Sequence, residues 1–153
     1  MRLWHQALIP YLDNKRLLAQ HRECCALRGL GWGKKHATVD YVFKYTIGRL
    51  YSYHLLVMHE MLNRDYVPLN IWYNRLWRGN QLGMSTTLQE IGITVYTETS
   101  VNVIPYKQLQ TIYPEHNDKY LRECLLNLKA KGAELINGKT IDQMLIELDL
   151  EKE

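Results

Sequence analysis

The sequence predicts a mainly α-helical fold, a single compact helical domain with long irregular connections between its helices. Four segments carry apolar residues three and four positions apart, which is the spacing of a helix that buries one face. Polar capping residues or helix-stopping glycines and prolines flank these segments. No internal repeat and no clear linker divides the 153 residues, so we expect residues 1–153 to form one domain.

The first predicted helix begins at Asp13 or Asn14, either of which can cap it, and ends at Gly29. Glu23 lies on the flank of its apolar face, so we expect this carboxylate to sit unburied beside the core, where it could meet a cleft. Arg22 falls outside the apolar face. The residues expected to face the core are Leu17, Leu18, His21, Cys24 and Cys25.

The second predicted helix lies within "RLYSYHLLVMHEMLNRDY", residues 49–66, and Pro68 ends it. His54 falls on its apolar face, and we interpret both His54 and His21 as core histidines. The "HEML" stretch lacks the second histidine of the zinc motif HExxH, because Asn63 stands four residues after His59. We therefore expect no metal site and no cofactor.

Two further helices are expected in the C-terminal half of the chain. One lies within residues 114–136 and stops at Gly132, and the other lies within residues 138–153, where Thr140 and Gln143 can form a capping box. Between the helical halves, β-branched residues around 91–103 are compatible with a short strand or hairpin, although an extended loop is equally consistent with them.

Charge is distributed unevenly along the chain. Residues 1–80 hold twelve Lys and Arg against five Asp and Glu, whereas residues 81–153 hold seven against eleven. Either the charges cluster without functional meaning, or residues 1–80 form a basic, DNA-facing half and residues 81–153 an acidic helical half. No stretch approaches the roughly 20 apolar residues that span a bilayer. The three cysteines are odd in number and include no CxxC pair, so we expect a reduced, cytoplasmic protein. We also expect a monomer without a membrane partner.

The start of the chain is unusually apolar. Leu3, Trp4, Leu8 and Ile9 predict an N-terminal segment that is packed against the fold, because chain ends otherwise tend to be polar and frayed. His5, Gln6 and Pro10 interrupt the apolar run, which is atypical of an export signal. We therefore expect the amino group of residue 1 to occupy a fixed place.

Three stretches of the N-terminal half resemble the pyrimidine-dimer DNA glycosylase family, the small helical endonuclease V type of phage and bacteria. They are the basic–aliphatic–Trp start "RLW", the helix segment "AQHRECCALRG" and the basic turn "KKH". Arg22 and Glu23 stand where this family has an arginine–glutamate pair, and Lys35 and His36 stand where it has a lysine–histidine pair. The helix "YHLLVMHEMLNRDY" is similar to the second long helix of the family, and the resemblance covers residues 1–68.

The resemblance implies a metal-independent DNA glycosylase with associated abasic-site lyase activity on double-stranded damaged DNA. Its nucleophile is the α-amino group of the first residue, which attacks the sugar of the damaged nucleotide and forms a Schiff base. Glu23 would then be the catalytic carboxylate. The phage members carry a small residue after an initiator Met that is removed, whereas Arg2 follows Met1 here. The nucleophile would therefore be the amine of a retained Met1.

The candidate DNA-binding residues are the cations of this half, Arg2, Arg22, Arg28, Lys34, Lys35 and His36. These cations and Glu23 also have an ordinary structural interpretation. A helix carboxylate such as Glu23 commonly pairs with a neighbouring cation, and most exposed arginines are merely solvated. The alternative function is a non-catalytic DNA-binding module of the same fold, which keeps a basic cleft and lacks the chemistry.

Overall fold

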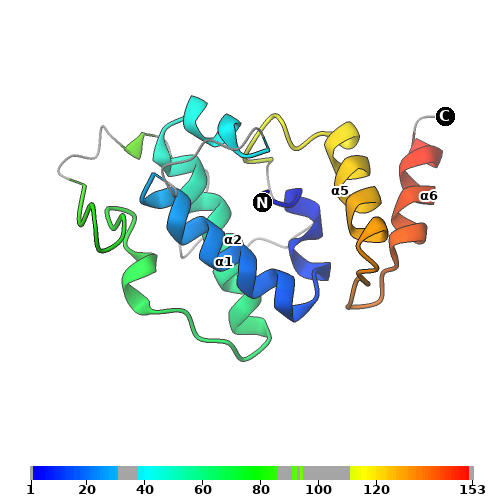
Figure 1. The fold of residues 1–153 in the computed structure, drawn as a ribbon, viewed down its shortest axis with the longest axis horizontal. Coiled ribbons are helices and arrows are strands. Elements are labelled where there is room, and N and C mark those ends of the chain that lie inside the picture. The colour runs from blue at the N-terminus through cyan, green and yellow to red at the C-terminus, as the bar shows by residue number, and fades with distance from the viewer. Residues whose placement is uncertain (1, 31–37, 86–90, 93, 95–110, 152–153) are drawn as a thin grey trace.

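The computed structural model describes residues 2–30, 38–85, 91–92, 94 and 111–151 (Figure 1). These residues are mainly helical, as predicted. Extended pairing within them is a single antiparallel bridge between Trp77 and Met84. The elements in chain order are η1 (Gln6–Tyr11), α1 (Asn14–Arg28), η2 (Asp40–Lys44), α2 (Ile47–Asn63), η3 (Asn70–Tyr73), α5 (Asp118–Ala130) and α6 (Ile141–Glu151).

Helices α1 and α2 pack directly against each other and form the centre of the molecule (Figure 1). α1 begins where predicted, because the Asp13 carboxylate accepts a hydrogen bond from the Arg16 amide, and Gly29 caps its end. α2 is buried along most of its length. The N-terminal segment packs on this pair, and its apolar residues Leu3, Trp4, Leu8 and Ile9 are all buried, as expected.

Helices α5 and α6 form an antiparallel pair beside the N-terminal segment (Figure 1). The predicted stop of α5 is confirmed, because Gly132 has a φ of +70°, which a residue with a side chain rarely adopts. The predicted capping box of α6 is also confirmed. The Gln143 amide donates to Thr140 Oγ1 at 3.1 Å, and the Thr140 amide donates to Gln143 Oε1 at 3.0 Å.

Two structural observations bear on the remaining expectations about the fold. The strand or hairpin suggested for residues 91–103 falls almost entirely outside the described residues, and Ile91, Gly92 and Thr94, which are described, belong to no strand. Among the helices of the described ranges, none combines the length and apolar character needed to cross a bilayer.

The buried face of α1 is rotated from the predicted one. The prediction that Glu23 is unburied is wrong, since its side chain is 9% exposed, whereas His21 and Cys25 are only partly buried. The rotation arises because polar side chains on the flank find partners in neighbouring segments, which an analysis of apolar spacing leaves out. The buried residues of α1 are Leu17, Gln20, Glu23, Cys24, Leu27 and Arg28.

Arg28 is a structural cation at the end of α1. Its side chain is 1% exposed, so the prediction that it adds to an exposed DNA-binding surface is wrong. Its guanidinium donates to the carbonyl oxygens of Trp72, Asn74 and Trp77 at 2.7–2.8 Å, and to His54 Nδ1 at 3.0 Å. Burial lowers the pKa of Arg28 to about 10, which still leaves it charged at neutral pH. Arg28 therefore fastens the segment after α2 to α1.

We predict that Arg28→Met lowers the free energy of unfolding by about 3 kcal/mol or more, since it leaves the buried ring of His54 and three backbone carbonyl groups without their charged donor. Urea titration followed by circular dichroism measures this loss. The matched control is Arg75→Met on the same segment, where the side chain is exposed and a change within about 0.5 kcal/mol is expected. Equal unfolding midpoints for the two variants would contradict the role assigned to Arg28.

His116 is a buried histidine that ties the N-terminal segment to η2. The Gln6 amide donates to His116 Nδ1 at 3.0 Å, so the ring proton lies on Nε2, which is 2.7 Å from the Tyr41 hydroxyl. Burial, together with repulsion from the adjacent His5, lowers the pKa of His116 to about 3. The ring is therefore neutral in the folded protein at every pH near neutrality.

This histidine predicts a loss of stability in mild acid. The unfolded chain takes up a proton on His116 below about pH 6.5 whereas the folded chain does not, so stability falls as the pH drops from about 6.5 towards about 3. The contribution is at most about 1.4 kcal/mol per pH unit. In urea titrations between pH 7 and 5, the free energy of unfolding of His116→Asn should fall less steeply with decreasing pH than that of the parent chain.

Tyr41→Phe is the control for this experiment, because it removes the same hydrogen bond and keeps the histidine. It should retain the steeper pH dependence of the parent. If the free energy of unfolding falls equally steeply with decreasing pH in His116→Asn and in the parent, His116 is not the group that takes up the proton.

Candidate active site

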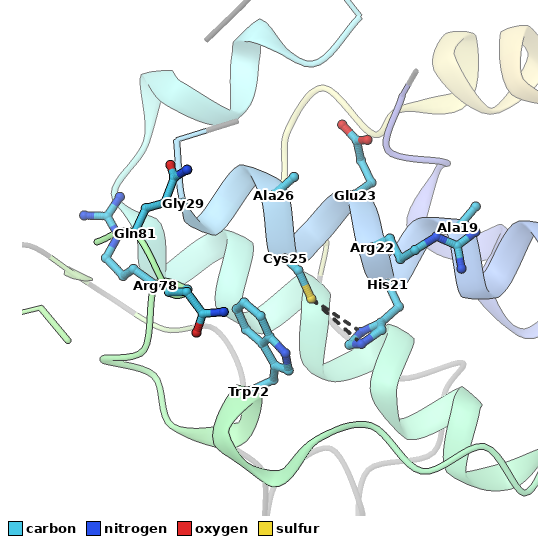
Figure 2. Close-up of a pocket in the computed structure, with 12 residues that line it drawn as sticks. Ala19, His21, Arg22, Glu23, Cys25, Ala26, Gly29, Trp72, Arg78 and Gln81 are labelled. Atoms are coloured by element: carbon cyan, nitrogen blue, oxygen red, sulfur yellow. Dashed lines mark hydrogen bonds between the residues drawn. The ribbon is translucent and has the colours of Figure 1, made fainter. Parts of the chain in front are cut away.

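A cleft with a volume of about 780 Å³ runs along one side of α1 (Figure 2). α1 forms one wall, and η3 together with the segment that follows it forms the other. Arg22 is exposed on the α1 wall and Arg78 lies on the opposite wall, so the cleft carries positive charge from both sides. The lining residues are Ala19, His21, Arg22, Glu23, Cys25, Ala26, Gly29, Trp72, Arg78, Gly79, Asn80 and Gln81.

Glu23 and the pair of Cys25 and His21 project from different sides of α1. In Figure 2 the Glu23 carboxylate points away from the side on which the Cys25 sulfur and the His21 ring approach Trp72. This follows from helix geometry, because residues two positions apart lie on roughly opposite faces. Both groups line the same cleft, and they project from different sides of α1.

Gln20, one helical turn before Glu23, binds the backbone of the N-terminal segment at two points. Its Oε1 accepts a hydrogen bond from the Trp4 amide at 2.7 Å, and its Nε2 donates to the Arg2 carbonyl at 3.0 Å. Gln20 is 3% exposed, and the Tyr53 hydroxyl donates to its Oε1 at 2.8 Å. The same hydroxyl lies 2.6 Å from the Trp4 carbonyl. We call this arrangement of Gln20 and Tyr53 the N-terminal clamp.

A further contact reaches the same segment from α5. The Tyr120 hydroxyl donates to the Leu3 carbonyl at 2.5 Å. The guanidinium of Arg2 lies over the rings of Trp4 and Tyr120, with distances of 5.6 and 5.9 Å from its central carbon to the ring centroids. Residues 2–4 are thus held by side chains from α1, α2 and α5, and the backbone of this segment has a defined position next to α1.

The structure locates three of the eight site residues predicted from the sequence in or beside the site. Glu23 and Arg22 line the cleft, and Arg2 lies partly buried on the N-terminal segment. Arg28 is buried and serves the fold. The remaining predictions lie outside the described residues: Met1, Lys34, Lys35 and His36.

Sequence reasoning missed Gln20, Tyr53 and Trp72 as site residues. Gln20 has the spacing of a flanking polar residue, and no local signal distinguishes an amide that binds backbone from one that is solvated. The Trp-rich composition after Pro68 indicated an aromatic segment, but only the tertiary fold places Trp72 across from α1.

The floor of the cleft contains a group of three side chains from α1 and α2 that could hold a metal ion: His21, Cys25 and His54. His54 Nε2 lies 2.8 Å from His21 Nδ1 and 3.9 Å from Cys25 Sγ. Burial is the largest cause of each pKa shift in this group: it lowers the pKa of both histidines and raises that of the Cys25 thiol to about 11. The expectation that His54 is a core residue is confirmed, since its side chain is fully buried.

Comparison with known proteins supports the resemblance seen in the sequence. Residues 1–74 match the model of a family described as pyrimidine dimer DNA glycosylase. No curated protein and no solved structure matched the chain. The matched stretch contains α1, α2 and η3, and with them the N-terminal clamp and Glu23. Through these first 74 residues, just under half of its length, the chain is similar to the pyrimidine dimer DNA glycosylase family.

Proposed function

We propose that this protein is a DNA glycosylase with associated abasic-site lyase activity, which uses the α-amino group of Met1 and the carboxylate of Glu23. Its substrate is double-stranded DNA that contains pyrimidine dimers or related damage. The observation that carries the proposal is the N-terminal clamp, because it holds the backbone of Arg2 on Gln20, which lies one helical turn before the buried Glu23.

The geometry supports a reactive amine near Glu23. Side chains one turn apart on a helix have Cβ atoms about 5–6 Å from each other, so the amide of Gln20 and the carboxylate of Glu23 occupy adjacent positions along α1. The Cα atom of Met1 is joined to that of Arg2 across about 3.8 Å. Gln20 holds the carbonyl of Arg2, the residue to which Met1 is bonded, and we propose that the Met1 amine reaches Glu23 from this anchored residue.

The chemistry favours a chain-terminal amine over a lysine. The pKa of an α-amino group is about 7.7–8.0, against about 10.4 for lysine, so a substantial fraction is neutral and nucleophilic near pH 7.5. In the proposed reaction, the amine nitrogen bonds to C1′ of the damaged nucleotide as the bond from C1′ to the base breaks. The departing base takes the bonding electrons. One amine proton then passes to the ring oxygen as the bond from C1′ to that oxygen breaks, and the other is lost to solvent, which gives the Schiff base.

Glu23 is proposed to act at two points. As a carboxylate, it stabilises the positive charge that develops on the sugar when the base leaves. It then removes a proton from C2′ of the Schiff base, and the electron pair expels the 3′ phosphate in a β-elimination that cuts the strand. Burial suits both roles, because charge interactions strengthen where water is excluded.

Cations around the cleft are proposed to hold the DNA backbone. Arg22 is exposed on α1 and Arg78 faces it across the cleft, which places positive charge on both walls. Arg2 lies next to the clamp, and we keep Lys34, Lys35 and His36 as proposed phosphate contacts. Because phosphate contacts release bound counterions, the affinity for DNA should fall steeply with salt concentration.

One experiment separates this enzyme from the alternative, a DNA-binding module without chemistry. The protein is incubated with abasic-site DNA and borohydride, which reduces a Schiff base to a stable secondary amine. A covalent protein–DNA adduct supports the enzyme. Salt-sensitive binding without any adduct supports the binding module and contradicts the proposal.

We predict that Glu23→Gln keeps its affinity for DNA within about threefold and loses strand cleavage by a factor of about 10² or more, as expected for removal of a general base. Cleavage of an end-labelled duplex with one abasic site measures the rate at saturating enzyme. Glu123→Gln, an exposed carboxylate on α5, is the matched control and should cleave at the parent rate. Retained cleavage in Glu23→Gln would remove this residue from the mechanism.

We also predict that Gln20→Glu slows cleavage by about tenfold or more at saturating DNA while the dissociation constant for DNA changes little. The carboxylate still accepts from the Trp4 amide but cannot donate to the Arg2 carbonyl, so the first residues lose their alignment. Gln143→Glu on α6 is the control. A variant that binds DNA more weakly and yet cleaves at the parent rate once bound would contradict a positioning role for Gln20.

A further inference from the structure

We propose that His21, Cys25 and His54 together bind one divalent ion of the zinc class at the floor of the cleft, with the fourth coordination position open to the cleft. None of the three proposed ligands is a residue of the proposed amine chemistry. The Glu23 carboxylate projects from the other side of α1, as Figure 2 shows.

The distances between the ligand atoms are close to those of a tetrahedral zinc site. With Zn–N bonds of about 2.0–2.1 Å and a Zn–S bond of about 2.3 Å, ligand nitrogens lie about 3.3 Å apart and a nitrogen and a sulfur about 3.6 Å apart. Here the two nitrogens are 2.8 Å apart, and Cys25 Sγ lies 3.9 Å from His54 Nε2 and 4.0 Å from His21 Nδ1. Side-chain shifts of about half an ångström therefore complete the geometry.

The secondary structure holds the three ligands in place. His21 and Cys25 are four residues apart, so they lie on one face of α1. His54 comes from the buried middle of α2, and the two helices pack against each other. A thiolate and two imidazoles favour zinc-class ions over Mg²⁺ or Ca²⁺, which prefer oxygen ligands.

The surroundings leave one side of the site accessible. His21 and Cys25 line the cleft, whereas His54 is fully buried behind them. An ion held by three protein ligands at this place would keep water or a small anion in its fourth position, which is the coordination of open zinc sites. Its positive charge would stand at the floor of a cleft whose walls carry Arg22 and Arg78.

Arg28 determines which protons the ion must displace. A guanidinium only donates hydrogen bonds, so Arg28 fixes His54 Nδ1 as the acceptor and places the ring proton of His54 on Nε2, towards His21 Nδ1. An ion that binds Nε2 releases this proton to solvent, and the thiol of Cys25 releases a second one. The resulting thiolate and imidazolate balance the charge of the ion, and the positive charge of Arg28 stabilises the imidazolate.

Titration of the full-length chain with Co²⁺, a spectroscopic substitute for Zn²⁺, tests the proposal. We expect saturation at one Co²⁺ per chain, the intense visible bands of tetrahedral cobalt and a thiolate-to-cobalt charge-transfer band in the near ultraviolet. One equivalent of Zn²⁺ should bleach these bands. About two protons should be released per ion bound, measured in weakly buffered solution.

Variants of the two partly buried ligands identify the site, because they disturb the core less than a change at His54. Cys25→Ser should lose the charge-transfer band although Cys24 and Cys124 remain, and His21→Asn should weaken Co²⁺ binding at least tenfold. The control, His59→Asn on α2, should bind as the parent does. Absence of tetrahedral cobalt bands in the parent, or their persistence in Cys25→Ser with an unchanged charge-transfer band, would overturn the assignment.

Discussion

The candidate site depends on two hydrogen bonds that the side-chain amide of Gln20 makes to the backbone of the N-terminal segment, one with Arg2 and one with Trp4. They join the N-terminal segment to α1, and Tyr53 from α2 and Tyr120 from α5 add to them. A chain end loses much conformational entropy when it is ordered. Here side chains from three helices hold residues 2–4 and offset that loss, and one of these helices, α1, also carries the buried carboxylate of Glu23.

Two buried polar side chains of α1, Gln20 and Arg28, bind different segments of the chain. Towards its middle, Gln20 binds the N-terminal segment. At its end, Arg28 binds three carbonyl groups and so fixes the opposite wall of the cleft, including Trp72. The Glu23 carboxylate and the pair of His21 and Cys25 project from different sides of α1, although all three side chains line the cleft.

Local signals predicted the helices and their ends well. Asp13, Gly132 and the pair of Thr140 and Gln143 act within one helical turn, so their effect is readable from the sequence. The buried face of α1 was not predictable in this way, because Gln20 and Arg28 are buried through partners that lie 16 to 49 residues away. The approach of His21 to His54 likewise depends on how two helices pack.

Peptide mapping of a borohydride-trapped protein–DNA adduct tests the central claim most directly. After nuclease and protease digestion, mass spectrometry locates the residue that carries the reduced sugar, and the intact protein shows whether Met1 is present with a free amine. The account predicts that the label lies on the α-nitrogen of Met1, in the peptide that contains Arg2. A label on a lysine side chain with Met1 unmodified would contradict it.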